Sequence, residues 1–168
     1  WIDFLNSRWL ITHPPFRDGL LDPQWLAGLA AGHGLALPEG EVSELVRAEM
    51  FELRRVLAEA VDELGRGEGL GDARVAALNR WLRGAPVRLE LTCERGAFRS
   101  QLRPVEGGWP AVWQRIVASF CETLATHEPR RIRKCGNPAC GWVVYDASKN
   151  ASRRWCCNTC ASLMKVRR

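Results

Sequence analysis

The sequence feature that most restricts this fold is the spacing of cysteines in the last forty residues. Four residues separate Cys135 from Cys140, and after a gap of fifteen residues Cys156, Cys157 and Cys160 follow. Two close thiol pairs joined by a loop can hold one tetrahedral Zn²⁺, because each pair binds the metal from one turn of chain. The spacing alone leaves Cys156 and Cys157 open as the partner of Cys160. Four thiolates leave no free coordination position, so the predicted zinc is structural.

The same stretch is strongly basic. Residues 130–168 contain ten Lys or Arg and one acid, Asp146, whereas residues 1–129 contain fourteen basic and eighteen acidic residues. We therefore expect two parts, a mildly acidic body at 1–129 and a basic zinc-finger module at 130–168. A segment of about forty residues rarely buries enough apolar surface to fold alone, and a structural metal is a common remedy.

The body is predicted to be helical with one β-hairpin. Asp22-Pro23 is typical of a helix start, and apolar residues at helical spacing predict further helices at about 41–64, 73–83 and 109–126. Val75 and Leu78 are expected on the buried face of the second of these. Glu94-Arg95-Gly96 is turn-like.

Apolar and polar residues alternate on both sides of that turn, which predicts a half-buried hairpin at about 87–105. Cys93 and Cys121 fall on apolar faces and are expected to be buried. The predicted fold class is mainly α with a small β-hairpin (α+β), followed by a treble-clef or ribbon-like zinc finger with a strand near 142–145 and a helix from 158 to 168.

Several classes of protein are disfavoured. Seven cysteines, five of them near the C-terminus, indicate reduced thiols in a cytoplasmic, metal-binding protein and not a secreted disulfide framework. No apolar run reaches the roughly 18 residues of a membrane span, and we expect no signal peptide, although the chain begins at Trp1 without Met. The three histidines are far apart and no nucleophile motif or phosphate loop is present, so we do not expect an enzyme.

The cysteine module resembles the CGNR zinc finger. The resemblance is carried by Cys-x4-Cys, an aromatic-aliphatic strand, Asp146-x-Ser148, Arg153-Arg154-Trp155-Cys156, the further Cys160, and Lys165 five residues after it. It favours Cys156 as the ligand, because that cysteine follows Arg-Arg-Trp, although Cys157-x2-Cys160 is the commoner zinc knuckle. The family's Cys-Gly-Asn-Arg reads Cys160-Ala-Ser-Leu163 here, so Leu163 replaces an arginine suited to a phosphate contact.

The first part of the chain is similar, more loosely, to the ABATE domain. The matching segments are Asp3-Phe4-Leu5-Asn6, Trp25-Leu26 and Leu53-Arg54-Arg55. Bacterial stress-induced transcription regulators of the ABATE type end in the CGNR finger, so the resemblance covers the whole chain. It implies a body that senses a small-molecule or protein effector, or forms a homodimer, and a finger that binds DNA.

The basic module, the zinc site and the resemblance together predict a bacterial DNA-binding transcription regulator. Lys and Arg neutralise phosphates and release counterions, which makes binding steeply salt-dependent. The predicted phosphate contacts are Arg153, Arg154, Lys165, Arg167 and Arg168. Two alternatives remain open: a zinc-scaffolded module that docks an acidic protein, and a thiol redox sensor built on the adjacent Cys156 and Cys157.

Overall fold

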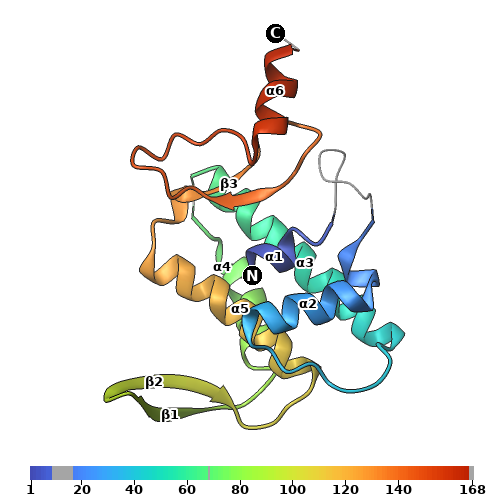
Figure 1. Ribbon diagram of the computed structural model, residues 1–168, viewed down its shortest axis with the longest axis vertical. Helices are drawn as coiled ribbons and strands as arrows, with labels where there is room; N and C mark the ends of the chain where they lie inside the picture. Colours follow the sequence, from blue (N-terminus) through green and yellow to red (C-terminus); the bar gives the residue numbers. More distant parts are fainter. Residues whose placement is uncertain (9–16, 68, 167–168) are drawn as a thin grey trace.

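The computed structural model describes residues 1–8, 17–67 and 69–166, so the predicted phosphate contacts Arg167 and Arg168 lie outside the described residues. The fold is mainly helical with two small antiparallel sheets (Figure 1). Among the described helices, none is long and apolar enough to cross a membrane. The elements are α1 (Ile2–Leu5), η1 (Gly19–Leu21), α2 (Pro23–His33), α3 (Glu44–Gly65), α4 (Asp72–Leu82), β1 (Val87–Glu94), β2 (Ala97–Pro104), α5 (Trp109–Thr126), η2 (Pro129–Arg131), β3 (Ile132–Lys134), β4 (Val143–Tyr145) and α6 (Asn158–Val166).

Helix α3 is the longest element, and the body packs around it. Met50, Leu53 and Leu57 recur at helical spacing and are completely buried. The apolar side of α5 belongs to the same core, with Val117 and Phe120 also fully buried. The core of the body therefore lies where these two helices meet α1, α2 and α4.

The helix starts show where local signals decide the boundary. Asp22 caps α2 as predicted, because its carboxylate accepts hydrogen bonds from the amides of Gln24 and Trp25. Helix α3 begins at Glu44, three residues later than predicted, because the Ser43 hydroxyl accepts the Val46 amide.

Helix α4 begins at Asp72, with Gly71 in the capping position. The predicted burial of Val75 is wrong: this side chain is 42% exposed, whereas Ala77 and Leu78 are buried. The buried stripe of α4 is thus rotated away from Val75. A pattern of apolar residues in a short helix does not fix which edge of the stripe its neighbours cover.

The hairpin of β1 and β2 forms at the predicted place but not with the predicted burial. Its register pairs Leu89 with Leu102, Leu91 with Ser100 and Cys93 with Phe98. The alternating apolar side chains lie on one face as expected, but that face is exposed, and the expected burial of Cys93 is wrong. Figure 1 shows the hairpin projecting from one end of the helices. Alternation of apolar and polar residues predicts a strand with one apolar and one polar face, but it does not predict which element, if any, covers the apolar face.

The C-terminal module packs against the body through its small sheet. Ile132 of β3 and Val143 of β4 are 2% exposed and belong to the core formed by α3 and α5. Lys134 forms an ion pair with Asp62 of α3, with 2.6 Å between the charged atoms. In Figure 1 the β3 strand lies across the end of α3, and α6 points away from the body.

Asn6, at the end of α1, makes the most specific contact between the two parts. Its side-chain amide donates to the carbonyl of Val143 and its carbonyl accepts the Val143 amide, both at 2.8 Å and both buried. The Cys135 amide donates to the Trp142 carbonyl across the β3–β4 sheet. In the neighbouring pair, Lys134 and Val143, the backbone N–H and C=O groups therefore point away from the partner strand. Asn6 therefore completes the free edge of β4 as a neighbouring strand would.

Candidate metal centre and basic surface

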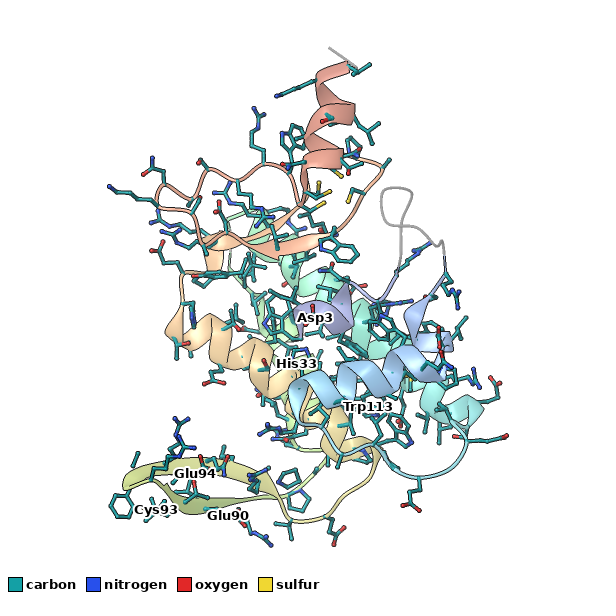
Figure 2. All side chains as sticks on the ribbon, viewed as in Figure 1. Asp3, His33, Glu90, Cys93, Glu94 and Trp113 are labelled. Carbon is teal, nitrogen blue, oxygen red and sulfur yellow. The ribbon has the colours of Figure 1, made fainter. Side chains whose placement is uncertain are left out.

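Four cysteines converge at the base of α6. The sulfur atoms of Cys135, Cys140, Cys156 and Cys160 all lie within 4.8 Å of one another, and all four side chains are buried. The Cys140–Cys156 and Cys156–Cys160 sulfur pairs are each 3.6 Å apart. A tetrahedral zinc with Zn–S bonds of about 2.3 Å sets its sulfurs about 3.8 Å apart, so the donor set fits one such ion. Figure 2 shows the yellow sulfur atoms gathered below this helix.

The four thiols come from two turns and one helix. Cys135 follows β3, and the Cys140 amide closes the first turn by donating to the Asn137 carbonyl at 2.9 Å. Cys156 lies in the second turn, and Cys160 is on the first turn of α6. This is the treble-clef arrangement, in which a knuckle, a short sheet and a helix start together present the ligands.

The first turn depends on two residues between its cysteines. Asn137 is 2% exposed, and its side chain accepts the Ala139 amide and donates towards the Cys160 sulfur at 3.5 Å. A Cβ atom on Gly136 would stand 3.0 Å from both the Arg154 carbonyl oxygen and the Trp155 ring. A side chain at position 136 would therefore force the Arg154 backbone or the Trp155 ring to shift. Hydrogen bonds that point at a sulfur favour its thiolate form, and hence metal binding.

The thiols of the cluster differ in acidity. Burial opposes ionisation of Cys135, but hydrogen bonds from the amides of Asn137 and Cys156 outweigh it and lower the pKa of this thiol. Burial, followed by hydrogen bonds with Cys160 and Cys140, raises the pKa of Cys156 well above its ordinary value. Four buried thiolates repel one another, so full ionisation of the cluster requires a cation in its middle.

Cys157 lies outside the group of four. Its side chain is half-buried, and its sulfur is 3.7 Å from that of Cys156. The backbone carbonyl of Cys157 accepts the Ala161 amide at the start of α6. Thus the structure brings together the set that the resemblance favoured, with Cys157 beside it.

Asp146 organises the loop between the two turns. The buried carboxylate accepts hydrogen bonds from the amide and hydroxyl of Ser148, at 2.9 and 2.6 Å, and from the Arg153 amide at 2.8 Å. These bonds, the Ser148 hydroxyl first, hold the Asp146 pKa below its usual value. Arg131 donates to the carbonyls of Asp146 and Ser148 from the other side. Asp146 and Ser148 therefore shape this turn.

The described candidates for phosphate contacts occupy different environments. Arg153 is engaged with the finger itself, since its guanidinium donates to the backbone carbonyls of Trp155 and Cys156. Arg154 is exposed, with its guanidinium 5.8 Å from the Trp155 ring centre. Lys165 is exposed on the last turn of α6, where the expected arginine is replaced by the 42% exposed Leu163.

Arg54 and Arg55, in the segment that resembles the ABATE domain, form ion pairs. Arg54 donates to both carboxylate oxygens of Asp18, and Arg55 binds Glu52 and Glu59 on its own helix. Both arginines also line a surface cavity beside Trp142. The ion pairs are the stronger structural feature, because they account for the charged nitrogen atoms.

Sequence reasoning missed the roles of Asn6 and Asn137. A buried Asn that hydrogen-bonds the backbone of a strand far away in the sequence produces no recognisable spacing of residues. Asn6 could have been suspected, because it closes the Asp3–Asn6 segment that resembles the ABATE domain. Asn137 sits between two metal-binding cysteines, where a side chain that bonds its own turn is common.

Comparison with known families agrees with this geometry. Residues 131–168 match the model of the CGNR zinc finger, and residues 1–127 match the ABATE model, described as "Putative stress-induced transcription regulator". No curated protein matches the chain. The ABATE match covers well over half of the sequence, and the four converging cysteines supply one structural zinc site in the finger. The chain belongs to the ABATE family, and its residues 131–168 form a CGNR zinc finger.

Proposed function

We propose that this protein is a DNA-binding transcription regulator whose zinc finger and α6 contact duplex DNA. The observation that carries the proposal is the combination of a basic finger with a helix that points away from the body (Figure 1). Nothing among the described elements covers α6 beyond its first turns, and Val166 near its end is 87% exposed. A helix that projects from a basic module is suited to enter a DNA groove, while the basic residues contact the flanking phosphates.

The zinc ligands in this proposal are Cys135, Cys140, Cys156 and Cys160. Cys156 is chosen over Cys157 because its sulfur is buried and lies 3.6 Å from two others of the set. A bound zinc would join Cys160, on the first turn of α6, to the cysteines of the first turn, and these ligands would thereby set the direction in which α6 leaves the finger.

The phosphate contacts are Arg153, Arg154 and Lys165, together with Arg167 and Arg168 beyond the described residues. Arg153 uses part of its guanidinium to hold the second turn, but a guanidinium carries five N–H donors, and the remainder are free for a phosphate. Arg154 and Lys165 are therefore the cleaner residues for mutation, because their loss leaves the finger's hydrogen bonds in place.

The test is a salt titration of duplex binding by the zinc-loaded, full-length protein, followed by fluorescence anisotropy of a labelled mixed-sequence duplex. Arg154→Ala and Lys165→Ala should each weaken binding and each reduce the slope of log K against log salt by about 0.9. Arg17→Ala removes a 63% exposed arginine from the body and should change neither quantity. Leu163→Arg restores the family's arginine and should increase the slope by a similar amount.

Three results would reject the proposal or replace it. Equal effects of Arg17→Ala and Lys165→Ala would mean that charge and not the finger drives binding. A partner protein that is retained after nuclease treatment and lost in Arg154→Ala would favour the protein-docking alternative. Release of zinc by mild peroxide that slows markedly in Cys157→Ser would favour a redox sensor, for which the 3.7 Å Cys156–Cys157 sulfur distance is the supporting observation.

The body is proposed to receive the signal. A cavity of about 380 Å³ lies between α1, α2 and the finger, and its lining includes Trp25, the Asp3–His33 pair and Trp142. Because Trp142 belongs to the finger, a small molecule in this cavity would contact both parts of the chain. We also propose a cytoplasmic location, where thiols stay reduced, and a homodimer, which would place two fingers on one duplex.

A further inference from the structure

The β1–β2 hairpin carries an apolar face that the other described residues do not cover. We define the hairpin face by the side chains that the register places on one side of the two strands. Leu89 and Leu91 are each 70% exposed, Phe98 is 72% exposed and Leu102 is 52% exposed. Monomeric proteins rarely expose large apolar side chains so close together. The hairpin face consists of Val87, Leu89, Leu91, Cys93, Phe98, Ser100, Leu102 and Pro104.

The opposite side of the hairpin is polar and faces the body at its root. There Arg88 and Arg103 bind Glu90, and these three residues line a surface cavity shared with α5. Arg115 of α5 donates to the Leu102 carbonyl and ties the hairpin to the body. Figure 2 shows Cys93 and its neighbour Glu94 pointing to opposite sides of the hairpin. The hairpin face is therefore directed away from the described helices.

An isolated two-stranded hairpin is only marginally stable in water and needs a cover for its apolar side. The strands β1 and β2 have eight residues each and are fully paired from Val87–Pro104 to Glu94–Ala97. A hairpin that is this long and regular, with its apolar residues exposed, is typical of a surface that packs against a partner. The described residues 1–8, 17–67 and 69–166 do not supply the other half of such an interface.

We propose that the missing half is a second copy of this chain, and that two hairpin faces pack against each other across a two-fold axis to form a four-stranded β-sandwich. Packing of two sheets with their apolar sides inwards is a common arrangement of such faces. A two-fold axis needs only one patch that is complementary to itself. The hairpin face meets this condition because it contains no charged side chain, so a second copy brings no unpaired charge to it.

The size of the hairpin face agrees with a dimer. Its five large apolar residues are 37–72% exposed in each copy, and two facing hairpins would bury them together, in an interface on the order of the roughly 800 Å² per partner of a standard one. Homodimer interfaces are also richer in apolar area than interfaces that form transiently. A lipid surface is the less suitable occupant, because Arg88, Arg99 and Arg103 lie on the other side of the strands and could not reach headgroups.

The test is the mass of the full-length, zinc-loaded protein in solution, measured by sedimentation velocity and light scattering from micromolar to hundred-micromolar concentration. The wild type should be dimeric. Leu91→Glu places a carboxylate in the centre of the interface and should weaken association at least about a hundredfold. Leu45→Glu is the matched control, because Leu45 is 71% exposed on α3, away from the hairpin. It should leave the dimer intact.

Helical circular dichroism and zinc content should be the same in both variants, since both positions are exposed in the single chain. A wild type that stays monomeric throughout, or a dimer that Leu91→Glu and Leu45→Glu affect equally, would overturn the proposal. So would a monomer that binds anionic phosphatidylserine vesicles and loses that binding in Leu91→Glu. The result does not depend on DNA binding: a dimer that fails to bind duplex would contradict the proposed function and leave this inference standing.

Discussion

Replacement of Asn6 by Ala tests how firmly the finger is attached to the body. In the native chain the Asn6 side chain satisfies both the N–H and the C=O of Val143, each at 2.8 Å in a buried position. Alanine would leave both groups without partners. A buried polar group left unsatisfied costs about 1–3 kcal/mol, so the two together should lower the free energy of unfolding by about 2–6 kcal/mol. That is a large fraction of the roughly 5–15 kcal/mol of an ordinary domain.

The assay is urea unfolding of the zinc-loaded protein, followed by helical circular dichroism, with amide hydrogen exchange at Val143. Asn6→Ala should lower the midpoint and expose the Val143 amide to exchange, while zinc content stays at one per chain. Asn150→Ala removes an exposed Asn from the finger and is the control. A loss below about 0.5 kcal/mol in Asn6→Ala, within the range of ordinary surface changes, would refute the reasoning.

Three further predictions concern the finger. Cys156→Ser should abolish stoichiometric zinc binding and Cys157→Ser should preserve it, as measured by metal analysis of reduced protein; the reverse result would reassign the ligand. Gly136→Ala should destabilise the metal-loaded finger by about 1–3 kcal/mol, because its Cβ would press on the Arg154 carbonyl and the Trp155 ring, and competition with a chelator measures this. Asp146→Asn should reduce stability near neutral pH. Because the Asp146 pKa is lowered on folding, its contribution is complete above about pH 4 and is lost as the pH falls through the lowered value, so urea midpoints of the two proteins should converge only below about pH 4. A gap that does not shrink there would contradict this account.

The parts of the fold that could be predicted are those determined by short-range chemistry. The Asp22 cap, the turn between β1 and β2, and the four clustered cysteines each follow from a few neighbouring residues. The wrong predictions concern the burial of side chains in elements whose positions were predicted correctly. Val75 and Cys93 carry the right periodicity, but their exposure depends on which distant element lies opposite, and no local pattern specifies that. The roles of Asn6 and Asn137 were not predicted for the same reason, because their hydrogen-bond partners are backbone groups or thiols that only folding brings close.

The finger is expected to support the body in addition to making the proposed DNA contacts. Ile132 and Val143 lie in the body's core, yet each is within three residues of a predicted zinc ligand, Cys135 or Cys140. Loss of the metal releases the ends of β3 and β4 and should withdraw both side chains from the core. At about 1.5–3 kcal/mol for each buried aliphatic side chain, the body should lose about 3–6 kcal/mol.

Chelation should therefore lower the melting temperature of the helical signal itself, by about 2–4 °C for each kcal/mol in a chain of this size. The matched control is Ile132→Ala, which weakens the same contact without touching the cysteines and should reduce the further effect of chelation. Helices that melt at the same temperature with zinc bound and with zinc removed would show that the finger is a separate unit. A shared transition would mean instead that metal binding, and any ligand that stabilises the body, act on one cooperative structure, because the elements that position α6 are also part of the core around α3.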